Sequence, residues 1–466
     1  MLFNSYEFIL LFMPVVVGGY FAIGQRSNIA GHYWLIVASL FFYGWWNPVY
    51  LWLIIFSLSV NFSIGKYLLA GRQSKNRLAL GIAFNLLLLG YYKYTDFFLE
   101  NVNALLGTDY NLIHIILPLG ISFFTFTQIA YLVETYRGVV KEHNFRSYIL
   151  FVTYFPHLLA GPIIHYEQMM PQFMDKDLKK VNYENLSRGL FLFTIGLIKK
   201  VMIADTLGNW ADAGYASVGL IDLSTLAAWT ISLAYTFQLY FDFSGYTDMA
   251  LGVSLMLNIR LPINFDSPYK SASIIEFWRR WHITLSFFLR DYLYIPLGGN
   301  RKGKLRKYLN ILLTMLLGGL WHGAGWTYVF WGGTHGLGIV INHIFRERGG
   351  SLPRWMGICL TFLFVNFAWV LFRAESVVQA LTLYSSMLYI GDWQNMVQGV
   401  SGAMPDGRKE FLAEILLLLV VMFVPNSIEI SRRMKNNYKW AVAVGVLLTL
   451  SVLALNRDTA FLYYQF

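Results

Sequence analysis

The chain has 466 residues, of which 56% are hydrophobic and only 13% are charged. Soluble domains typically have about 45–50% apolar and about 25% charged residues, so this chain has too few polar side chains to cover a water-facing surface. The composition excludes intrinsic disorder, and the single cysteine excludes a disulfide-stapled secreted scaffold. The net charge of +10 then indicates basic loops beside a membrane rather than nucleic-acid binding. The sequence predicts an all-α polytopic integral membrane protein.

Apolar stretches close to the length of a membrane-spanning helix, roughly 20 residues, recur along the chain. The first, 8–23, has no basic residue before it, and the first basic side chain is Arg26. A cleaved signal peptide has positive charge ahead of its apolar run, so we expect this segment to stay as a membrane helix. We expect about 11–14 helices, some of them re-entrant or amphipathic. The candidate spans are 6–23, 33–48, 50–69, 78–94, 112–134, 148–165, 189–205, 222–240, 242–258, 308–325, 327–345, 356–373, 411–425 and 440–455.

Charges in the loops predict the topology. Loops 66–77 and 135–147 are basic, whereas 95–111 contains three acidic residues and no basic one. Loops 346–354 and 432–439 are again rich in arginine and lysine. Because basic loops remain in the cytoplasm, we expect a multi-pass protein with its N-terminus outside.

The middle of the chain, 148–300, does not divide cleanly into spans. Pro156, Pro162 and the pair Lys199-Lys200 interrupt its apolar segments. These segments are either amphipathic helices at the cytoplasmic interface or re-entrant segments that line a site, and the two can coexist. We see no internal repeat, and one membrane domain over 1–466 is the simplest organisation.

His322 is the first candidate for chemistry. It lies in an apolar hairpin with four glycines in 318–325 and with Trp321 and Trp326 nearby. A buried neutral imidazole can accept a proton near pH 7, as a general base must. The alternative is a glycine-lined seam between helices, in which the histidine only bonds a neighbouring helix.

His282 lies in a different setting, the basic amphipathic stretch 276–286, which is followed by the basic cluster 301–307. Such a stretch most often binds an anionic membrane surface. The same positive field would also attract a phosphate-bearing donor such as coenzyme A.

Other motifs carry less chemistry. The stretch 298–304 has the glycine and lysine spacing of a phosphate-binding loop. The next residue is Leu305, however, whereas such a loop has a serine or threonine there that binds magnesium. No HExxH motif and no regular set of metal ligands is present, so we predict no metal site. Asp242 and Asp248 lie in an apolar run, where they indicate a proton relay, partners of a cation or a broken helix. His335, thirteen residues after His322, is interpreted as a supporting or structural residue.

The order of several motifs resembles the membrane-bound O-acyltransferase (MBOAT) superfamily, in particular its bacterial alginate O-acetyltransferase branch. The likeness covers nearly the whole chain. The motifs that carry it are 1–8, 42–45, 117–126 and 154–162, and the most specific are 241–248, 277–299 and 320–336.

This resemblance implies a ring of helices around a thin central core, with a tunnel that reaches both faces. It implies that His322 is the catalytic histidine and that His282 is the second family position, which orients hydrogen bonds or stabilises an oxyanion. No metal is required, because a thioester is already activated. The residues that we expect to bind substrate are Trp278, Arg279, Arg280, Arg290, Asn300, Trp321 and Trp326, with the phosphates of the donor also near Arg301.

The resemblance further implies an O-acetyltransferase of the bacterial inner membrane. It would use acetyl-coenzyme A as a substrate, with no permanently bound cofactor, and pass the acetyl group to an exported, alginate-like polysaccharide through periplasmic acetyltransferases. The lipid bilayer is its other partner, and no nucleic acid is expected. The alternatives are a teichoic-acid D-alanyltransferase that uses a carrier protein, and a non-enzymatic transporter, which needs neither histidine.

Overall fold

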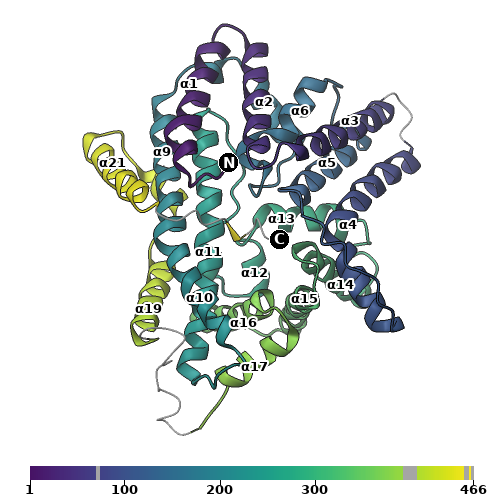
Figure 1. Ribbon diagram of the computed structural model, residues 1–466, viewed down its shortest axis with the longest axis vertical. Coiled ribbons are helices and arrows are strands. Elements are labelled where there is room, and N and C mark those ends of the chain that lie inside the picture. The colour runs from purple at the N-terminus through teal and green to yellow at the C-terminus, as the bar shows by residue number, and fades with distance from the viewer. Residues whose placement is uncertain (70–73, 392–406, 456–460, 463–466) are drawn as a thin grey trace. The chain divides into compact units, whose positions relative to one another are not determined.

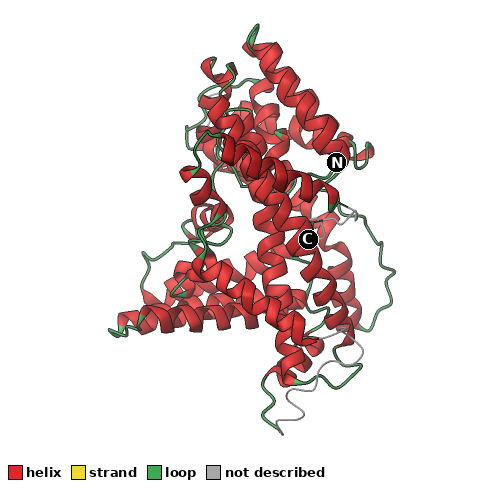
Figure 2. Cartoon of the chain, turned by 90° about the vertical axis from the view of Figure 1, so that its left-hand side faces the viewer, coloured by secondary structure: helices red, strands yellow, loops and turns green. Residues whose placement is uncertain are grey.

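The computed structural model describes residues 1–69, 74–391, 407–455 and 461–462. Within these ranges the chain is helical, with loops between the helices and no β-strand longer than the isolated bridge between Val218 and Ile221 (Figures 1 and 2). The described residues form two compact units. The first unit contains 1–197, 246–263 and the described part of 431–465, and the second contains 198–245 and the described part of 264–430.

The first unit consists mainly of helices from the N-terminal part of the chain. Ser27 and Asn144 begin two of them, since each side chain accepts a backbone N–H of the first turn. The elements are η1(Glu7–Phe12), α1(Met13–Gly24), α2(Asn28–Gly44), α3(Val49–Leu69), α4(Lys75–Leu106), α5(Ile121–Tyr136), α6(Phe145–Thr153), α7(Phe155–Leu158), α8(Tyr166–Met174), η2(Asp177–Lys179), α9(Tyr183–Ile198) and α21(Tyr438–Leu453).

Polar and aromatic contacts hold this unit together. Asn61 of α3 and Asn85 of α4 are fully buried and exchange side-chain hydrogen bonds of 3.2 and 2.6 Å. Such amide pairs join helices where an apolar environment gives no hydrophobic driving force. Rings of Phe3, Phe8 and Phe42 pack against one another, which accounts for part of the high aromatic content.

The second unit contains the predicted site. Its elements are η3(Lys199–Ala204), α10(Asp205–Ser217), the N-terminal part of α11(Thr225–Met256), η4(Pro268–Lys270), α12(Ile274–Trp278), α13(Ile283–Leu289), η5(Arg290–Tyr294), α14(Lys304–His322), α15(Trp326–Glu347), α16(Arg354–Arg373), α17(Val377–Met387), α19(Gly407–Phe423) and most of α20(Ser427–Arg433). In this unit α14 and α15 form a closely packed hairpin, and α16 packs on α15.

Among the described residues, three helices are long and apolar enough to cross a membrane: Glu7–Gly24, Val49–Leu69 and Arg354–Arg373. A fourth span is present if the pair Arg408–Phe423 and Ser427–Arg433, bent by 52°, counts as one. These helices coincide with the predicted spans 6–23, 50–69, 356–373 and 411–425. The remaining predicted spans fall on shorter or more polar helices.

The prediction of two separate spans at 222–240 and 242–258 is wrong. The segments 222–240 and 242–258 are not separate but form one 32-residue helix, α11. The Ser244-Gly245 step that predicted a break costs a helix only about 1 kcal/mol, which packing along a largely buried helix outweighs. The span 148–165 is interrupted, as Pro156 and Pro162 predicted, because α6 and α7 are short and residues 159–165 continue as a mostly buried non-helical stretch. Protein covers that irregular backbone, as it must at membrane depth.

Candidate active site

His282 lies in a tight turn between two short helices of the second unit. Ser273 begins α12 by accepting the backbone N–H of Glu276, and the helix ends at Trp278. After the turn, Asn264 accepts hydrogen bonds from both the backbone N–H and the hydroxyl of Thr284, at 3.1 and 2.7 Å. Asn264 therefore caps α13, and the side chain of His282 is not used as the cap.

The backbone of His282 is strained. Its φ of 42° and ψ of 54° lie in the left-handed region, which non-glycine residues seldom adopt. Such a conformation costs about 1–3 kcal/mol and persists only where the surroundings enforce it, often at functional sites. The imidazole is fully buried, and the ring of Phe243 from α11 packs edge-on against it at 4.8 Å.

His322 is the last residue of α14, at the tip of the α14–α15 hairpin. The two helices approach backbone to backbone. A Cβ atom on Gly319 would collide with the carbonyl oxygen of Tyr328, and one on Gly332 would collide with that of Met315. These glycines form a packing seam between the two helices. Such a seam is one of the two interpretations that the sequence allowed for this motif. The seam places His322 beside the first turns of α15.

The two histidines face each other in an aromatic enclosure. Their ring centroids are 6.4 Å apart, and both side chains are at least 97% buried. The enclosing rings are Trp321, Trp331 and Phe372, whose centroids lie 4.9, 5.1 and 5.3 Å from that of His322.

Burial determines the charge of His282. It lies outside the spanning helices, and desolvation lowers its pKa to about 3. The ring is therefore neutral at pH 7 and can donate one hydrogen bond and accept another. Such a group suits a hydrogen-bonding role, and His322 stays the predicted base.

His335 and Trp278 form a buried pair behind this enclosure. The Trp278 indole N–H donates to His335 Nδ1 at 3.3 Å, and His335 is fully buried. Because Nδ1 accepts this bond, the proton of the neutral ring lies on Nε2. Trp331 contacts both His322 and His335, with centroid separations of 5.1 and 4.8 Å. His335 thus supports the enclosure through Trp331.

The residues predicted to bind substrate are dispersed. Trp321 lies in the enclosure, and Trp278 is directed to His335. Arg280 donates to Glu276 Oε1 at 3.1 Å and to the carbonyl oxygen of Asp266 at 3.0 Å, so it stabilises the turn before His282.

The other predicted substrate contacts lie on the surface. Arg279, Asn300 and Trp326 are exposed. Arg290 is half-exposed and forms a bidentate ion pair with Asp291, at 2.6 and 2.8 Å. These groups do not line the histidine enclosure.

Asp242 is part of a buried ion cluster in the second unit. Lys200 Nζ lies 2.8 Å from Asp242 and 2.9 Å from Asp205, and all three side chains are at most 10% exposed. Lys200 belongs to the π-helical segment η3, so the cluster joins η3 and α10 to α11, one residue before Phe243. Lys200 is therefore the cationic partner of Asp242, which is one of the roles that the sequence allowed for this aspartate. Asp248 lies in the first unit.

The sequence missed Phe243, Trp331 and Asn264. The spacing of Trp331 and His335, four residues apart in a helical segment, indicates a shared face and could have identified the tryptophan. Nothing local marks Asn264 as the cap of a helix that begins nineteen residues later. Within the described part of the chain, no three His, Cys, Asp or Glu side chains are grouped so as to hold a metal.

An all-helical chain with several apolar spans and a buried histidine pair has the character of an intramembrane enzyme. The family model of MBOAT, the membrane-bound O-acyltransferase family, matches residues 133–377, which include both histidines. The chain belongs to this family and is a multi-pass membrane O-acyltransferase.

Among its relatives, the chain is 40% identical to the peptidoglycan O-acetyltransferase of Helicobacter pylori, over 100% of this chain and 98% of that protein. It is 44% identical to the probable alginate O-acetylase AlgI of Pseudomonas putida, over 84% of this chain and 81% of that protein. The teichoic acid D-alanyltransferase of Streptococcus thermophilus is 30% identical, over 54% of this chain.

Proposed function

We propose that the chain transfers the acetyl group of cytoplasmic acetyl-coenzyme A to hydroxyl groups of an exported polysaccharide. The observation that carries this proposal is the buried histidine pair, His282 and His322, inside a membrane O-acyltransferase. Acyl transfer from a thioester needs a base for the attacking hydroxyl and a donor for the carbonyl oxygen. Two imidazoles whose ring centroids are 6.4 Å apart can supply both.

The transfer then proceeds in one displacement. The acceptor hydroxyl gives its proton to His322 as its oxygen attacks the carbonyl carbon of the thioester. His282 donates its N–H to the carbonyl oxygen, where negative charge develops. The new C–O ester bond forms, the C–S bond breaks, and the thiolate of coenzyme A takes the proton from the His322 imidazolium. The aromatic walls exclude water, which would otherwise hydrolyse the thioester.

The donor approaches from the basic face. Arg279 and Arg301 are exposed and suited to the phosphates of coenzyme A, and we place them on the cytoplasmic side in this proposal. A tunnel between the two faces would lead the acetyl group to an acceptor outside the cytoplasmic membrane, where periplasmic partner proteins deliver it to the polymer. The N-terminus then lies outside.

The acceptor is the glycan of the cell wall in this proposal, and an alginate-like exopolysaccharide is the second candidate. The peptidoglycan O-acetyltransferase aligns with the whole chain, whereas the alginate O-acetylase aligns with 84% of it. The higher identity of the alginate O-acetylase, 44% against 40%, favours the second candidate. D-alanyl transfer has the weaker support, from a relative that aligns with about half of the chain.

Proteoliposomes with a defined interior test the proposal. Labelled acetyl-coenzyme A is supplied outside, and peptidoglycan strands or de-acetylated alginate are enclosed with a periplasmic extract. We expect label on the peptidoglycan. Label on alginate alone would select the second candidate. Transfer only from D-alanyl carrier protein, with none from acetyl-coenzyme A, would overturn the proposed donor.

A further inference from the structure

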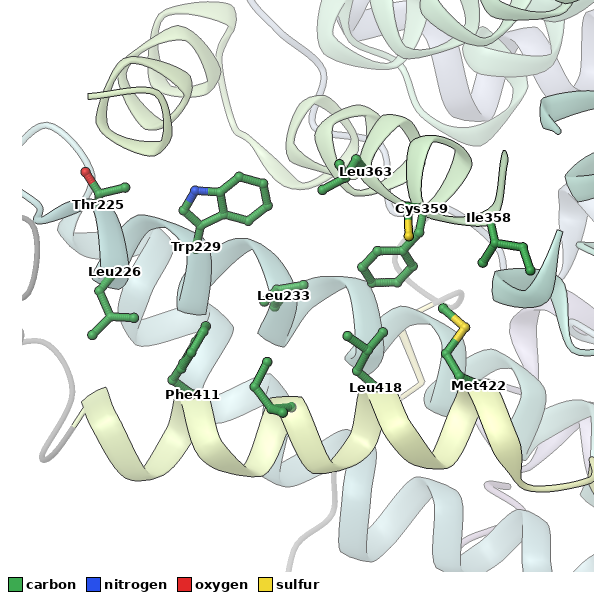
Figure 3. Close-up of a pocket in the computed structure, with 12 residues that line it drawn as sticks. Thr225, Leu226, Trp229, Leu233, Ile358, Cys359, Leu363, Phe411, Leu418 and Met422 are labelled. Carbon is green, nitrogen blue, oxygen red and sulfur yellow. The ribbon is translucent and has the colours of Figure 1, made fainter. Parts of the chain in front are cut away.

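An apolar groove lies in the second unit, away from the histidine pair. It has a volume of about 670 Å³ and lies between α11, α16 and α19. Side chains from the three helices point into it from opposite sides (Figure 3). Its lining includes Leu226 and Trp229 of α11, Cys359 and Leu363 of α16, and Phe411 and Leu418 of α19.

The wall formed by α11 is held in place. The Trp229 indole N–H donates to the carbonyl oxygen of Met387 at 3.0 Å, and its ring packs edge-on against Phe367 at 5.6 Å. The groove cannot collapse onto itself without breaking these contacts. Because an empty groove forfeits dispersion contacts along its whole lining, a membrane protein will fill it.

The groove has the length of one lipid chain. From Phe411 to Met422, α19 advances about 16 Å at 1.5 Å per residue. That is about half of a hydrocarbon core roughly 30 Å thick, and hence one leaflet. Its facing wall, α16, is itself a candidate membrane span.

Positive charge lies at one end of the groove. Arg408 precedes Phe411 by three residues and so lies on nearly the same face of α19, and its side chain is exposed. A phosphate group at the leaflet surface would meet this cation while an attached chain lies in the groove.

We propose that this groove binds one anionic phospholipid, with an acyl chain between α11, α16 and α19 and the phosphate at Arg408. The site is independent of the proposed acetyl transfer, since none of its residues belongs to the histidine enclosure.

The test is native mass spectrometry of the full-length protein from nanodiscs that contain equal amounts of phosphatidylglycerol and phosphatidylcholine. Ile415 and Leu363 line the groove from opposite helices and are partly exposed, so tryptophan can fill the groove from either side without disturbing the core. We expect Ile415→Trp and Leu363→Trp each to retain one phosphatidylglycerol fewer than the wild type. Leu416→Trp, whose position on α19 lies outside the lining, is the matched control and should retain the wild-type number.

Charge reversal tests the headgroup separately. Arg408→Glu should lower the preference for phosphatidylglycerol over phosphatidylcholine by about fivefold, the ratio typical of one basic residue at an anionic surface. Reversal of an exposed arginine of the first unit, Arg26→Glu, should leave the preference unchanged. Equal retention of both lipids by the wild type would overturn the anionic occupant. A co-purifying membrane protein that Ile415→Trp displaces would overturn the lipid itself.

Cys359, the chain's single cysteine, is an internal reporter, because it lines the groove and is exposed. Its alkylation by N-ethylmaleimide should be slower in phosphatidylglycerol nanodiscs than in phosphatidylcholine nanodiscs. Arg408→Glu should remove this difference. The same rate in both lipids for the wild type would contradict the proposal.

Discussion

His282 and His322 reach the same enclosure by different means. His322 is carried there by the end of a regular helix, whereas His282 depends on a left-handed backbone that Asn264 and Arg280 hold in place. The two residues should therefore respond differently to substitution. His282 contributes both a hydrogen-bonding group and a conformation that few residues adopt.

The role proposed for His282 predicts a particular order of variants. His282→Ala removes the donor to the carbonyl oxygen and should lower kcat about 10²–10³-fold, as loss of one oxyanion donor typically does. His282→Asn should recover part of this loss, because asparagine tolerates the left-handed region and can donate a hydrogen bond. Steady-state kinetics with acetyl-coenzyme A give both values.

The pH profile provides the check on this role. Burial lowers the pKa of His282 to about 3, so the residue does not titrate between pH 5 and 8. The pH dependence of the activity that remains in His282→Asn should match that of the wild type. A pH limb near 6 that disappears with this substitution would show that His282 is the titrating base instead.

At the scale of elements, the α14–α15 hairpin is the part of the fold that the site depends on most. The sequence identified its glycines and its histidine, but it could not tell which glycines meet backbone. Gly332 approaches the carbonyl oxygen of Met315, while its neighbour Gly333 meets only the flexible end of Leu316. The difference depends on the rotation of α15, which a pattern of glycines does not encode.

These neighbouring glycines make a matched pair. Gly332→Ala should lower stability by about 1–3 kcal/mol through overpacking, and should reduce activity because Trp331 moves with its helix. Gly333→Ala should be neutral or slightly stabilising, since alanine is the better helix former. Thermal unfolding in detergent measures both. Equal midpoints for the two variants would mean that the hairpin is not packed as described.

The ion cluster of Lys200, Asp205 and Asp242 is a second contact between elements, because it joins η3 and α10 to α11. Lys200→Met would leave two buried carboxylates without their cation and should cost about 3–5 kcal/mol. Adding Asp242→Asn should recover part of the loss. The exposed pair Lys180–Asp177 is the control, and Lys180→Ala should leave the unfolding midpoint unchanged. A midpoint for Lys200→Met equal to that of the wild type would contradict the cluster's structural role.

Composition alone predicted the class of the whole molecule, because a chain with 13% charged residues has no soluble alternative. The sequence also singled out His282 and His322, which the structure brings together, and their catalytic role stays a prediction. What could not be predicted were contacts between distant residues, such as the hydrogen bond that joins Trp278 to His335 across 57 positions. Because such contacts cannot be read from the sequence, Trp278 and Arg280 were expected to bind substrate. In the structure their polar groups form hydrogen bonds within the protein instead.

In the proposed function, donor binding depends on the electrostatic field of the basic face as a whole. Arg279→Glu, at an exposed position, should raise the dissociation constant for acetyl-coenzyme A about two- to fivefold, as is typical of one exposed charge pair. The effect should shrink as salt is raised from 20 to about 150 mM, where the Debye length is about 8 Å. Arg26→Glu is the control. If neither variant alters binding, this face contacts only lipid.

The most direct test of the central claim compares purified wild-type protein with His322→Gln, which keeps a polar side chain but no basic imidazole. Acetyl transfer is followed with labelled acetyl-coenzyme A, and donor binding is measured by calorimetry on the same preparations. We predict a loss of about 10²–10⁴-fold in kcat with an unchanged dissociation constant for the donor. A His322→Gln protein that transfers acetyl groups within a few-fold of the wild-type rate would contradict general-base catalysis by His322.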